Sequence, residues 1–229
     1  MNGTSQMLVF LIAIPLFSAA FLLLGGRALD KVGHIIGTLA SSAAFVIGLL
    51  EFFAMLGRAP ENRGVTQSLF TWIEVGNFNV GASLFLDQLS ICFVLLITGV
   101  GTLIHIYSIA YMSHDRDRRR FFAFLNLFIA AMLLLVLGDS YLSLYVGWEG
   151  VGLASYLLIG FWNQKPAYAT ASKKAFVMNR VGDMGLSFAI MIAFATMGTV
   201  SFAGVQEQVN NTSEAALTGM GIMLLVAAA

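Results

Sequence analysis

A single acidic residue, Glu149, lies in the middle of the apolar stretch from Tyr141 to Trp162, which contains no other charged residue. At a rise of ~1.5 Å per helical residue, its carboxylate would lie ~12 Å inside a hydrocarbon core of ~30 Å. A charged side chain at that depth costs several kcal/mol unless it is protonated, paired or hydrated. The residue type and its position therefore predict a role in moving ions through a bilayer.

Two tyrosines share the expected helical face of Glu149. Tyr145, Glu149, Gly152 and Tyr156 follow 4-3-4 spacing, so they form one stripe on a helix. Two phenols and a glycine beside a carboxylate could hold the short chain of water molecules that a proton path needs. The alternative is that the tyrosines are packing residues that satisfy a protonated glutamic acid. A second stripe, roughly opposite, predicts close contact with another helix, because its residues are small: Ser143, Gly147, Gly150 and Ala154.

A second charged group lies in the next apolar stretch. Arg180 and Asp183 are three residues apart and so face the same way on a helix, with Ser187 one turn deeper. One interpretation makes Asp183 a proton-relay or charge-coupling carboxylate whose charged form Arg180 stabilises. The other interpretation is an ion pair within one helix that has only a structural role.

A histidine lies in the stretch 87–111, where Thr98, Gly101, His105 and Ser108 form one stripe. Histidine has an unperturbed pKa of ~6.5 and can relay protons, so His105 is a candidate for a proton path. The alternative is a hydrogen bond from His105 to a neighbouring helix.

Two further acids lie near the ends of apolar stretches. Asp87 directly precedes the stretch that contains His105, and its position predicts a helix N-cap. Glu51 lies near the outer end of the stretch 34–56, from which its side chain could reach the membrane interface.

These residues belong to a chain with 59% hydrophobic and only 10% charged residues. Soluble domains have about 25% charged residues, so the composition predicts an all-α polytopic membrane protein. A seventh apolar segment begins near Ala215 and still continues at Ala229, so we expect a piece of a longer protein. Six full transmembrane helices are expected before it, at 7–25, 34–56, 87–111, 120–138, 141–162 and 176–198.

The longest polar insertion separates two parts of the chain. We divide the chain into helices 1 and 2 (1–57), an extracytoplasmic loop (58–86) and a region with helices 3 to 7 (87–229). Within the loop, residues 70–75 and 78–84 predict two strands around the two-residue turn Gly76-Asn77. The loop is therefore expected to carry a β-hairpin on the outer face.

Basic residues are distributed unevenly among the connections between the helices. Nine lie in the connections after helices 1, 3 and 5, against two after helices 2, 4 and 6. The positive-inside rule then places the N-terminus outside and the loop from His114 to Arg120 in the cytoplasm. The nine are Arg27, Lys31, Arg116, Arg118, Arg119, Arg120, Lys165, Lys173 and Lys174, and the two are Arg58 and Arg63.

Several classes of function have no support in the sequence. The net charge is zero and the basic residues are segregated, which argues against nucleic-acid binding. The single cysteine, Cys92, excludes an intrachain disulfide, and the three histidines lack metal-ligand spacing. There is no phosphate-binding loop, dinucleotide fingerprint, nucleophile elbow or haem motif. The energy for transport must therefore come from partner subunits or an ion gradient.

Five segments together resemble the antiporter-like membrane subunits of respiratory complex I, the NADH:quinone oxidoreductase. The Asn-Arg-Val-Gly-Asp segment favours the distal group of that family, the subunit L or chain 5 group, over related antiporters. The resemblance covers more than half of the chain, between Phe78 and Gly198. The segments are Leu86-Asp-Gln-Leu-Ser90, Ile106-Tyr-Ser-Ile-Ala-Tyr-Met112, Arg120-Phe-Phe-Ala-Phe-Leu-Asn-Leu-Phe128, Gly147-Trp-Glu-Gly-Val-Gly-Leu153 and Asn179-Arg-Val-Gly-Asp183.

The resemblance carries its own implications. It implies a subunit without a redox cofactor, with FMN, iron–sulfur clusters and quinone bound by partner subunits. Glu149 matches a glutamate of the family that is proposed to pair with a lysine on the seventh helix, and Arg180 and Asp183 match a charged pair on the sixth. That lysine is absent here and is expected within a few residues of Ala229. Other membrane-arm subunits, above all a neighbouring antiporter-like subunit, and the lipid bilayer are the partners implied.

We therefore predict a proton-translocating membrane subunit of NADH:quinone oxidoreductase, in which Glu149, Arg180 and Asp183 relay protons and couple charges. Tyr145, Tyr156 and His105 are candidates for the path. A bacterial cytoplasmic membrane is the expected location, with the mitochondrial inner membrane as the alternative. The rival functions are the large subunit of a multisubunit Na⁺/H⁺ antiporter and a membrane scaffold that pumps nothing.

Overall fold

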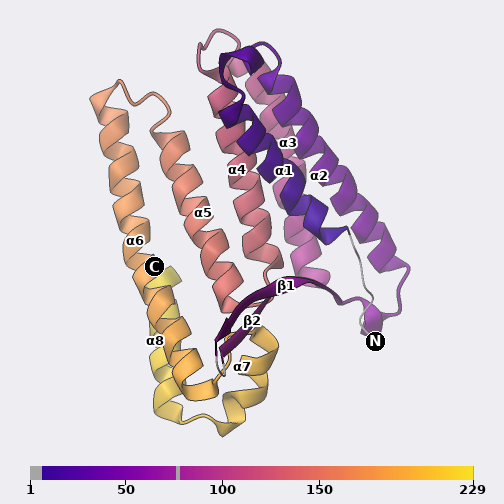
Figure 1. The fold of residues 1–229 in the computed structure, drawn as a ribbon, viewed down its shortest axis with the longest axis vertical. Coiled ribbons are helices and arrows are strands. Elements are labelled where there is room, and N and C mark those ends of the chain that lie inside the picture. Colours follow the sequence, from indigo (N-terminus) through magenta and orange to yellow (C-terminus); the bar gives the residue numbers. More distant parts are fainter. Residues whose placement is uncertain (1–6, 76–77, 229) are drawn as a thin grey trace.

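The computed structural model describes residues 7–75 and 78–228, and these are mostly helical. Figure 1 shows the long helices side by side, with two strands across one end. In chain order the elements are α1 (Leu8–Leu24), α2 (Gly33–Leu56), β1 (Val65–Val75), β2 (Phe78–Leu86), α3 (Gln88–Tyr111), α4 (Arg118–Leu137), α5 (Tyr141–Ile159), α6 (Pro166–Met197), α7 (Phe202–Gln208) and α8 (Glu214–Ala228).

The helices turn at two opposite ends of the molecule (Figure 1). We call one the basic end; it holds the connections 25–32, 112–117 and 160–165 and the first turns of α4 and α6. The other is the strand end; it holds β1, β2, α7 and the connection 138–140. The basic end also includes α6 as far as Lys174, so all nine basic residues counted after helices 1, 3 and 5 belong to it.

Five helices, α2 to α6, are long and apolar enough to cross a membrane. Among the described residues, α1 and α8 are apolar but shorter, so the prediction of six full spans is not confirmed. The helix that carries the expected sixth span is longer than that span, because α6 begins at Pro166 and has 32 residues. Such a helix is ~48 Å long and extends beyond a core of ~30 Å. The charged turn with Lys173 and Lys174 therefore belongs to the helix but lies outside its apolar part.

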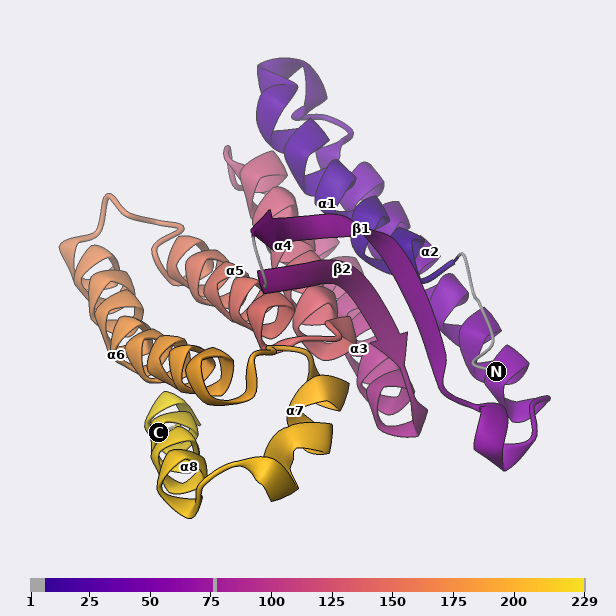
Figure 2. The ribbon, with the colours of Figure 1, turned by 60° about the horizontal axis from the view of Figure 1, so that its bottom comes forward.

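The strand end is built by β1 and β2, which pair as antiparallel neighbours. Val65 lies opposite Leu86, and the register shifts after Ser68 and again after Thr71. Both strands extend beyond the predicted ranges, and the predicted turn Gly76-Asn77 lies outside the described residues. Figure 2, with this end toward the viewer, shows the strands lying across the ends of α1, α3 and α4.

A continuous apolar core joins α1 to α4 and the strands. Side chains from all these elements are buried in one cluster, among them Leu8, Val65, Leu86, Val94 and Leu133. At the basic end, polar contacts between connections hold the helices in place. Arg119 is 2.9 Å from Asp30, and Trp162 Nε1 donates to Asp115 Oδ2 at 2.7 Å.

Local signals in the sequence explain where the functional helices begin and end. The Ser140 hydroxyl accepts from the backbone amide of Ser143 at 3.2 Å and caps α5. Proline at the first position begins α6, and Gly198, with φ of 69°, ends it. The predicted cap at Asp87 is confirmed, because its carboxylate accepts from the backbone amides of Leu89 and Ser90.

Candidate functional site

The rotation of α5 about its axis is set by its contact with α4. A Cβ on Gly147 would lie 2.5 Å from the backbone nitrogen of Leu135, and one on Gly150 would lie 3.0 Å from Ala131. The predicted close contact through the stripe of small residues is therefore confirmed. Because this stripe faces α4, the opposite stripe with Tyr145 and Glu149 faces α6.

Three charged side chains meet between α5 and α6. The guanidinium of Arg180 donates from Nη1 to Oε1 of Glu149 in a short contact, and the same nitrogen is 3.5 Å from Oδ2 of Asp183. The hydroxyl of Tyr145 donates to the same Oε1 of Glu149 at 2.9 Å. One arginine thus contacts two carboxylates, which come from different helices.

The two carboxylates differ in their surroundings. The Asp183 side chain is 6% exposed and that of Glu149 is 24% exposed, whereas Arg180 is 45% exposed. Oδ1 of Asp183 is fully buried and has no hydrogen-bond partner among the described residues. A buried carboxylate oxygen without a partner is costly when it is ionised, so this atom is a natural position for a proton or a water molecule.

Two glycines allow α8 to cover Asp183. A Cβ on Gly182 would lie 2.9 Å from the carbonyl oxygen of Ala227, and one on Gly185 would lie 2.8 Å from that of Met223. The backbone of α8 therefore passes directly over the turn of α6 that holds Asp183. A cavity of about 420 Å³ lies beside this contact, lined by residues of α5, α6 and α8 that include Trp148 and Gly182.

Tyr156 lies on the same helix as Glu149 but does not reach the cluster directly. Its ring lies 5.4 Å from the ring of Phe176, and the guanidinium of Arg180 lies 4.9 Å above that same ring. Gly152 faces the amide of Asn179, which a Cβ would approach to 3.6 Å. Tyr156 is thus connected to the charged cluster through one aromatic ring.

His105 belongs to a different polar cluster, at α2, α3 and α4. Its Nδ1 contacts the carbonyl oxygen of Gly101 at 2.8 Å, and its Nε2 lies 3.0 Å from the amide nitrogen of Asn126. The same amide nitrogen donates to the carbonyl oxygen of Gly37 on α2 at 3.1 Å. This arrangement matches the alternative interpretation, a hydrogen bond from His105 to a neighbouring helix. Its use in a proton path stays a prediction.

Glu51 is only 3% exposed. The position lies on the face of α2 that is turned to the interior, as do Gly48 and Met55, which are also buried. That its side chain could reach the membrane interface stays a prediction.

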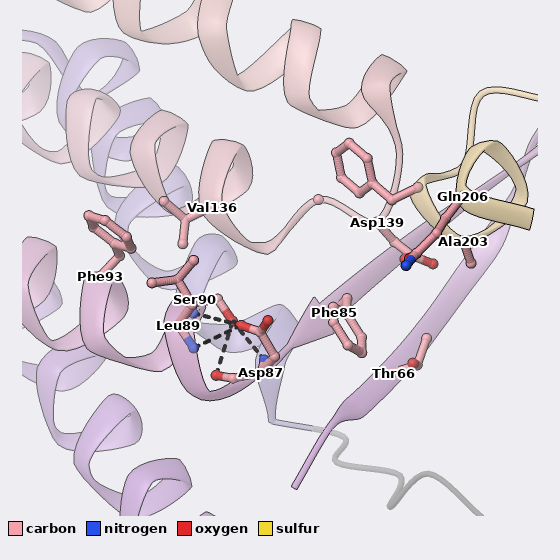
Figure 3. A pocket seen from close by; sticks show the side chains of 12 residues that line it. Thr66, Phe85, Asp87, Leu89, Ser90, Phe93, Val136, Asp139, Ala203 and Gln206 are labelled. Carbon is pink, nitrogen blue, oxygen red and sulfur yellow. Dashed lines mark hydrogen bonds between the residues drawn. The ribbon is translucent and has the colours of Figure 1, made fainter. Parts of the chain in front are cut away.

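A second cavity, of about 730 Å³, opens at the strand end between β1, β2, α3 and α7 (Figure 3). Asp87 and Asp139 contribute carboxylates to its lining. Asp87 is engaged in its helix cap, whereas the backbone of Asp139 connects β2 and α7 by hydrogen bonds to Ser83 and Phe202. Partial burial raises the pKa of the Asp139 carboxyl above its ordinary value.

The described residues contain no group of three or more His, Cys, Asp or Glu side chains that could hold a metal ion. The fold and the α5–α6 cluster define a class of protein: a polytopic helical membrane protein in which a buried and a partly buried carboxylate share one arginine.

Comparisons with known proteins specify that class. Residues 72–122 match the family described as NADH-ubiquinone oxidoreductase (complex I), chain 5 N-terminus. Residues 138–229 match NADH:quinone oxidoreductase/Mrp antiporter, TM. The chain belongs to this family of antiporter-like membrane subunits, in its subunit L and chain 5 group.

Curated relatives agree with this family. The chain is 58% identical to NADH-quinone oxidoreductase subunit L of Mycobacterium tuberculosis over 95% of its length, and 44% identical to that of Escherichia coli over 88%. It is 38% identical over 97% of its length to NADH-ubiquinone oxidoreductase chain 5 of Cryptococcus neoformans. The matched region covers 34%, 33% and 33% of these relatives, so the chain spans about a third of their length.

Solved structures share the fold. A chain of the archaeal membrane-bound sulfane sulfur reductase superposes with a TM-score of 0.79 at 17% identity, over 97% of this chain and 44% of the other. A chain of the Mrp complex from Dietzia sp. DQ12-45-1b superposes with a TM-score of 0.75 at 22% identity, over 97% of this chain and 23% of the other.

Sequence reasoning identified both helices of the cluster but missed the contact between them. The pair Arg180 and Asp183 follows from their spacing, whereas the contact of Arg180 with Glu149 joins residues 31 positions apart. The roles of Gly182 and Gly185 were also missed, although two glycines three residues apart beside a buried acid were a visible signal.

Proposed function

We propose that this chain is the N-terminal part of a proton-translocating membrane subunit of NADH:quinone oxidoreductase, and that Glu149, Arg180 and Asp183 hold and pass the proton. The observation that carries the proposal is the single guanidinium shared by two carboxylates from different helices. The similarity to subunit L over nearly the whole chain supports the complex in which it works.

The charge of the cluster explains how it can bind a proton. When both carboxylates are ionised, Arg180 neutralises only one of them and an excess negative charge remains. A proton bound by either carboxylate leaves the other to pair with Arg180 alone. The proton therefore belongs to the pair, and its position depends on where the guanidinium lies.

Coupling to the rest of the complex would be electrostatic. Electron transfer from NADH to quinone takes place in partner subunits that hold the flavin and the iron–sulfur clusters. A shift of charge along the membrane arm, from a neighbouring antiporter-like subunit, moves Arg180 between the two carboxylates. The weaker contact, 3.5 Å to Asp183, has room to shorten, so the arginine has two alternative partners within reach.

The family's seventh-helix lysine fits this arrangement. The backbone of α8 packs against Gly182 and Gly185 on α6, so a cation carried by this helix would lie near Asp183. A second cation there would compete with Arg180 for the carboxylates. Its approach would release the proton, and its withdrawal would favour uptake.

The location we propose is a bacterial cytoplasmic membrane, with the N-terminus outside and the basic end in the cytoplasm. The uneven distribution of basic residues between the two ends of the helices supports this orientation.

The test is Glu149→Gln in the full-length subunit within the assembled complex, because the change keeps the shape of the side chain and removes its titration. We expect fewer protons pumped per NADH oxidised in sealed vesicles, at an unchanged amount of complex. The matched control is Glu207→Gln on the exposed part of α7, which should pump normally. Normal pumping by the assembled Glu149→Gln complex would exclude the relay role and favour a scaffold.

A Na⁺/H⁺ antiporter subunit is the second candidate function, because the family match at 138–229 includes Mrp antiporters and the fold matches an Mrp complex. Purification separates the two. A complex I subunit should co-purify with flavin and iron–sulfur proteins, whereas an antiporter subunit should come without them and restore sodium tolerance to a sensitive host.

A further inference from the structure

A cavity at the basic end lies between α4, α5 and α6. Its volume is about 320 Å³, on the order of ten water molecules at ~30 Å³ each. Its polar lining residues come from all three helices and from the connection after α5: Arg120, Tyr156, Asn163, Ser172 and Lys173. The space is therefore large enough for a small headgroup and is formed only where the three helix ends meet.

The positive charge around this cavity favours the binding of an anion. Arg120 and Lys173 line it directly. Arg120 lies over the ring of Phe124 at 5.7 Å, and its contact with Asp117 is long, at 3.6 Å, so its guanidinium keeps free donors. The connections 112–117 and 160–165 and the adjacent helix ends hold seven basic residues against two acids, Asp115 and Asp117. Basic pockets between spanning helices at this side of a membrane suit lipid phosphates.

An exposed apolar track leads away from the cavity along α6. Val177 lies one turn deeper than Lys173 on the same face and is 61% exposed. Val181 and Met184 continue the face and are 56% and 57% exposed. On α5, Leu153 lies one turn deeper than the lining residue Leu157 and is also exposed. A phosphate in the cavity would thus sit directly above apolar surface that suits an acyl chain.

We propose that this cavity binds the headgroup phosphate of an anionic phospholipid, with Arg120 and Lys173 as its cationic contacts and the α6 track under its acyl chains. A soluble phosphate would use the cations but not the apolar track, which is why we assign the site to a lipid. The bound headgroup would bridge α4 and α6 at the end where α5 turns.

The site also has a connection to the charged cluster. Tyr156 lines the cavity, its ring contacts Phe176 at 5.4 Å, and Arg180 lies over that ring at 4.9 Å. A headgroup that bridges α4 and α6 across the end of α5 would therefore also restrict how far α6 moves from α5, where Glu149 contacts Arg180.

The experiment uses the intact complex in nanodiscs that contain a photoactivatable phosphatidylglycerol, or a phosphatidylcholine with the same chains. Crosslinks are mapped by mass spectrometry to the segments 120–124, 156–163 and 169–173. We expect phosphatidylglycerol to label these segments, and Arg120→Gln with Lys173→Gln to lower that labelling about tenfold. The matched control, Arg118→Gln with Lys174→Gln, removes two charges from the same helices outside the cavity lining and should keep the labelling.

Three outcomes would overturn the proposal. Equal labelling by phosphatidylcholine would mean that the headgroup charge is not recognised. Unchanged labelling in the Arg120 and Lys173 double variant would remove the two cations from the site. Displacement of the lipid by millimolar inorganic phosphate would show a site for a free anion. The readout is labelling, so it does not depend on the pumping role of Glu149.

Discussion

One guanidinium serves two carboxylates in this protein, and the three groups come from two helices. Arg180 can neutralise only one of the two carboxylates at a time, and we propose that this imbalance of charge lets the cluster bind a proton. Tyr145 donates a hydrogen bond to Glu149. Asp183 is more deeply buried and has one oxygen without a partner among the described residues, so we propose it as the acceptor of the proton.

Part of this site could be predicted from the sequence. Glu149 stands out because a carboxylate in the middle of an apolar stretch is costly, and Arg180 with Asp183 follows from helical spacing. The contact between Glu149 and Arg180 could not be predicted, because it depends on how α5 and α6 rotate against each other. For His105 the sequence left two interpretations, and the partner of its Nε2, Asn126 on α4, could not be predicted because it lies on another helix.

We expect the free energy of unfolding to depend on pH through Asp139 at the strand end. Burial raises the pKa of its carboxyl above 3.8, so the folded state holds this proton more tightly than the unfolded chain does. As the pH rises from 3.8 through the raised pKa, the unfolded chain loses the proton first and the free energy of unfolding falls. In Asp139→Asn this decrease in the free energy of unfolding should be absent, because the amide does not titrate. The stability of the variant relative to that of the original protein should therefore increase as the pH rises.

Thermal unfolding of the purified protein over a series of pH values measures this difference. The control is Asp87→Ala in the same cavity, which should lower stability by removing the side chain that caps a helix. Two parallel curves for Asp139→Asn and the original protein would contradict the expected change.

At the scale of elements, the two faces of α5 contact different helices. The stripe of small residues packs against α4, and the stripe with Tyr145 and Glu149 meets α6. The sequence predicted both stripes, since helical periodicity fixes which residues share a face. It did not predict the start of α6, because the charged turn before residue 176 was excluded from an apolar segment even though Pro166 marks a helix start.

A larger residue at Gly147 should disturb this arrangement. In Gly147→Leu the new side chain would meet the backbone of Leu135, which cannot move aside as a flexible side chain can. We expect a loss of stability of about 1–3 kcal/mol and less assembled complex, as measured by native gels. The control Gly221→Leu, at a position on α8 with open space around it, should assemble normally.

At the scale of the whole molecule, the two ends carry opposite charge. The basic end holds nine Lys and Arg residues against Asp30, Asp115 and Asp117. The strand end, with the adjacent connection 57–64, has only Arg58 and Arg63 against the acids Glu61, Glu74, Asp87, Asp139 and Glu207. The mostly helical architecture and this asymmetry could be predicted from composition and spacing alone. The packing of α8 across α6 could not, because it depends on the close approach of two glycines to another backbone.

This asymmetry predicts the orientation in the membrane. We expect a cysteine at Glu61, in the exposed connection before β1, to react with a membrane-impermeant maleimide in intact spheroplasts. A cysteine at Ser113, in the exposed connection after α3, should react only after permeabilisation. Both are made in a Cys92→Ser background, since Cys92 is exposed. Labelling of Ser113→Cys in intact spheroplasts would reverse the proposed topology.

The central claim is that Glu149 and Asp183 hold one proton between them while they share Arg180. Infrared difference spectroscopy of the intact complex measures this directly, as the carboxylic acid C=O band that changes when NADH is added. The account predicts one such band that is lost in Glu149→Gln and equally in Asp183→Asn, because the remaining carboxylate then pairs with Arg180 and stays ionised. A band that persists unchanged in both variants would contradict a proton shared by this pair.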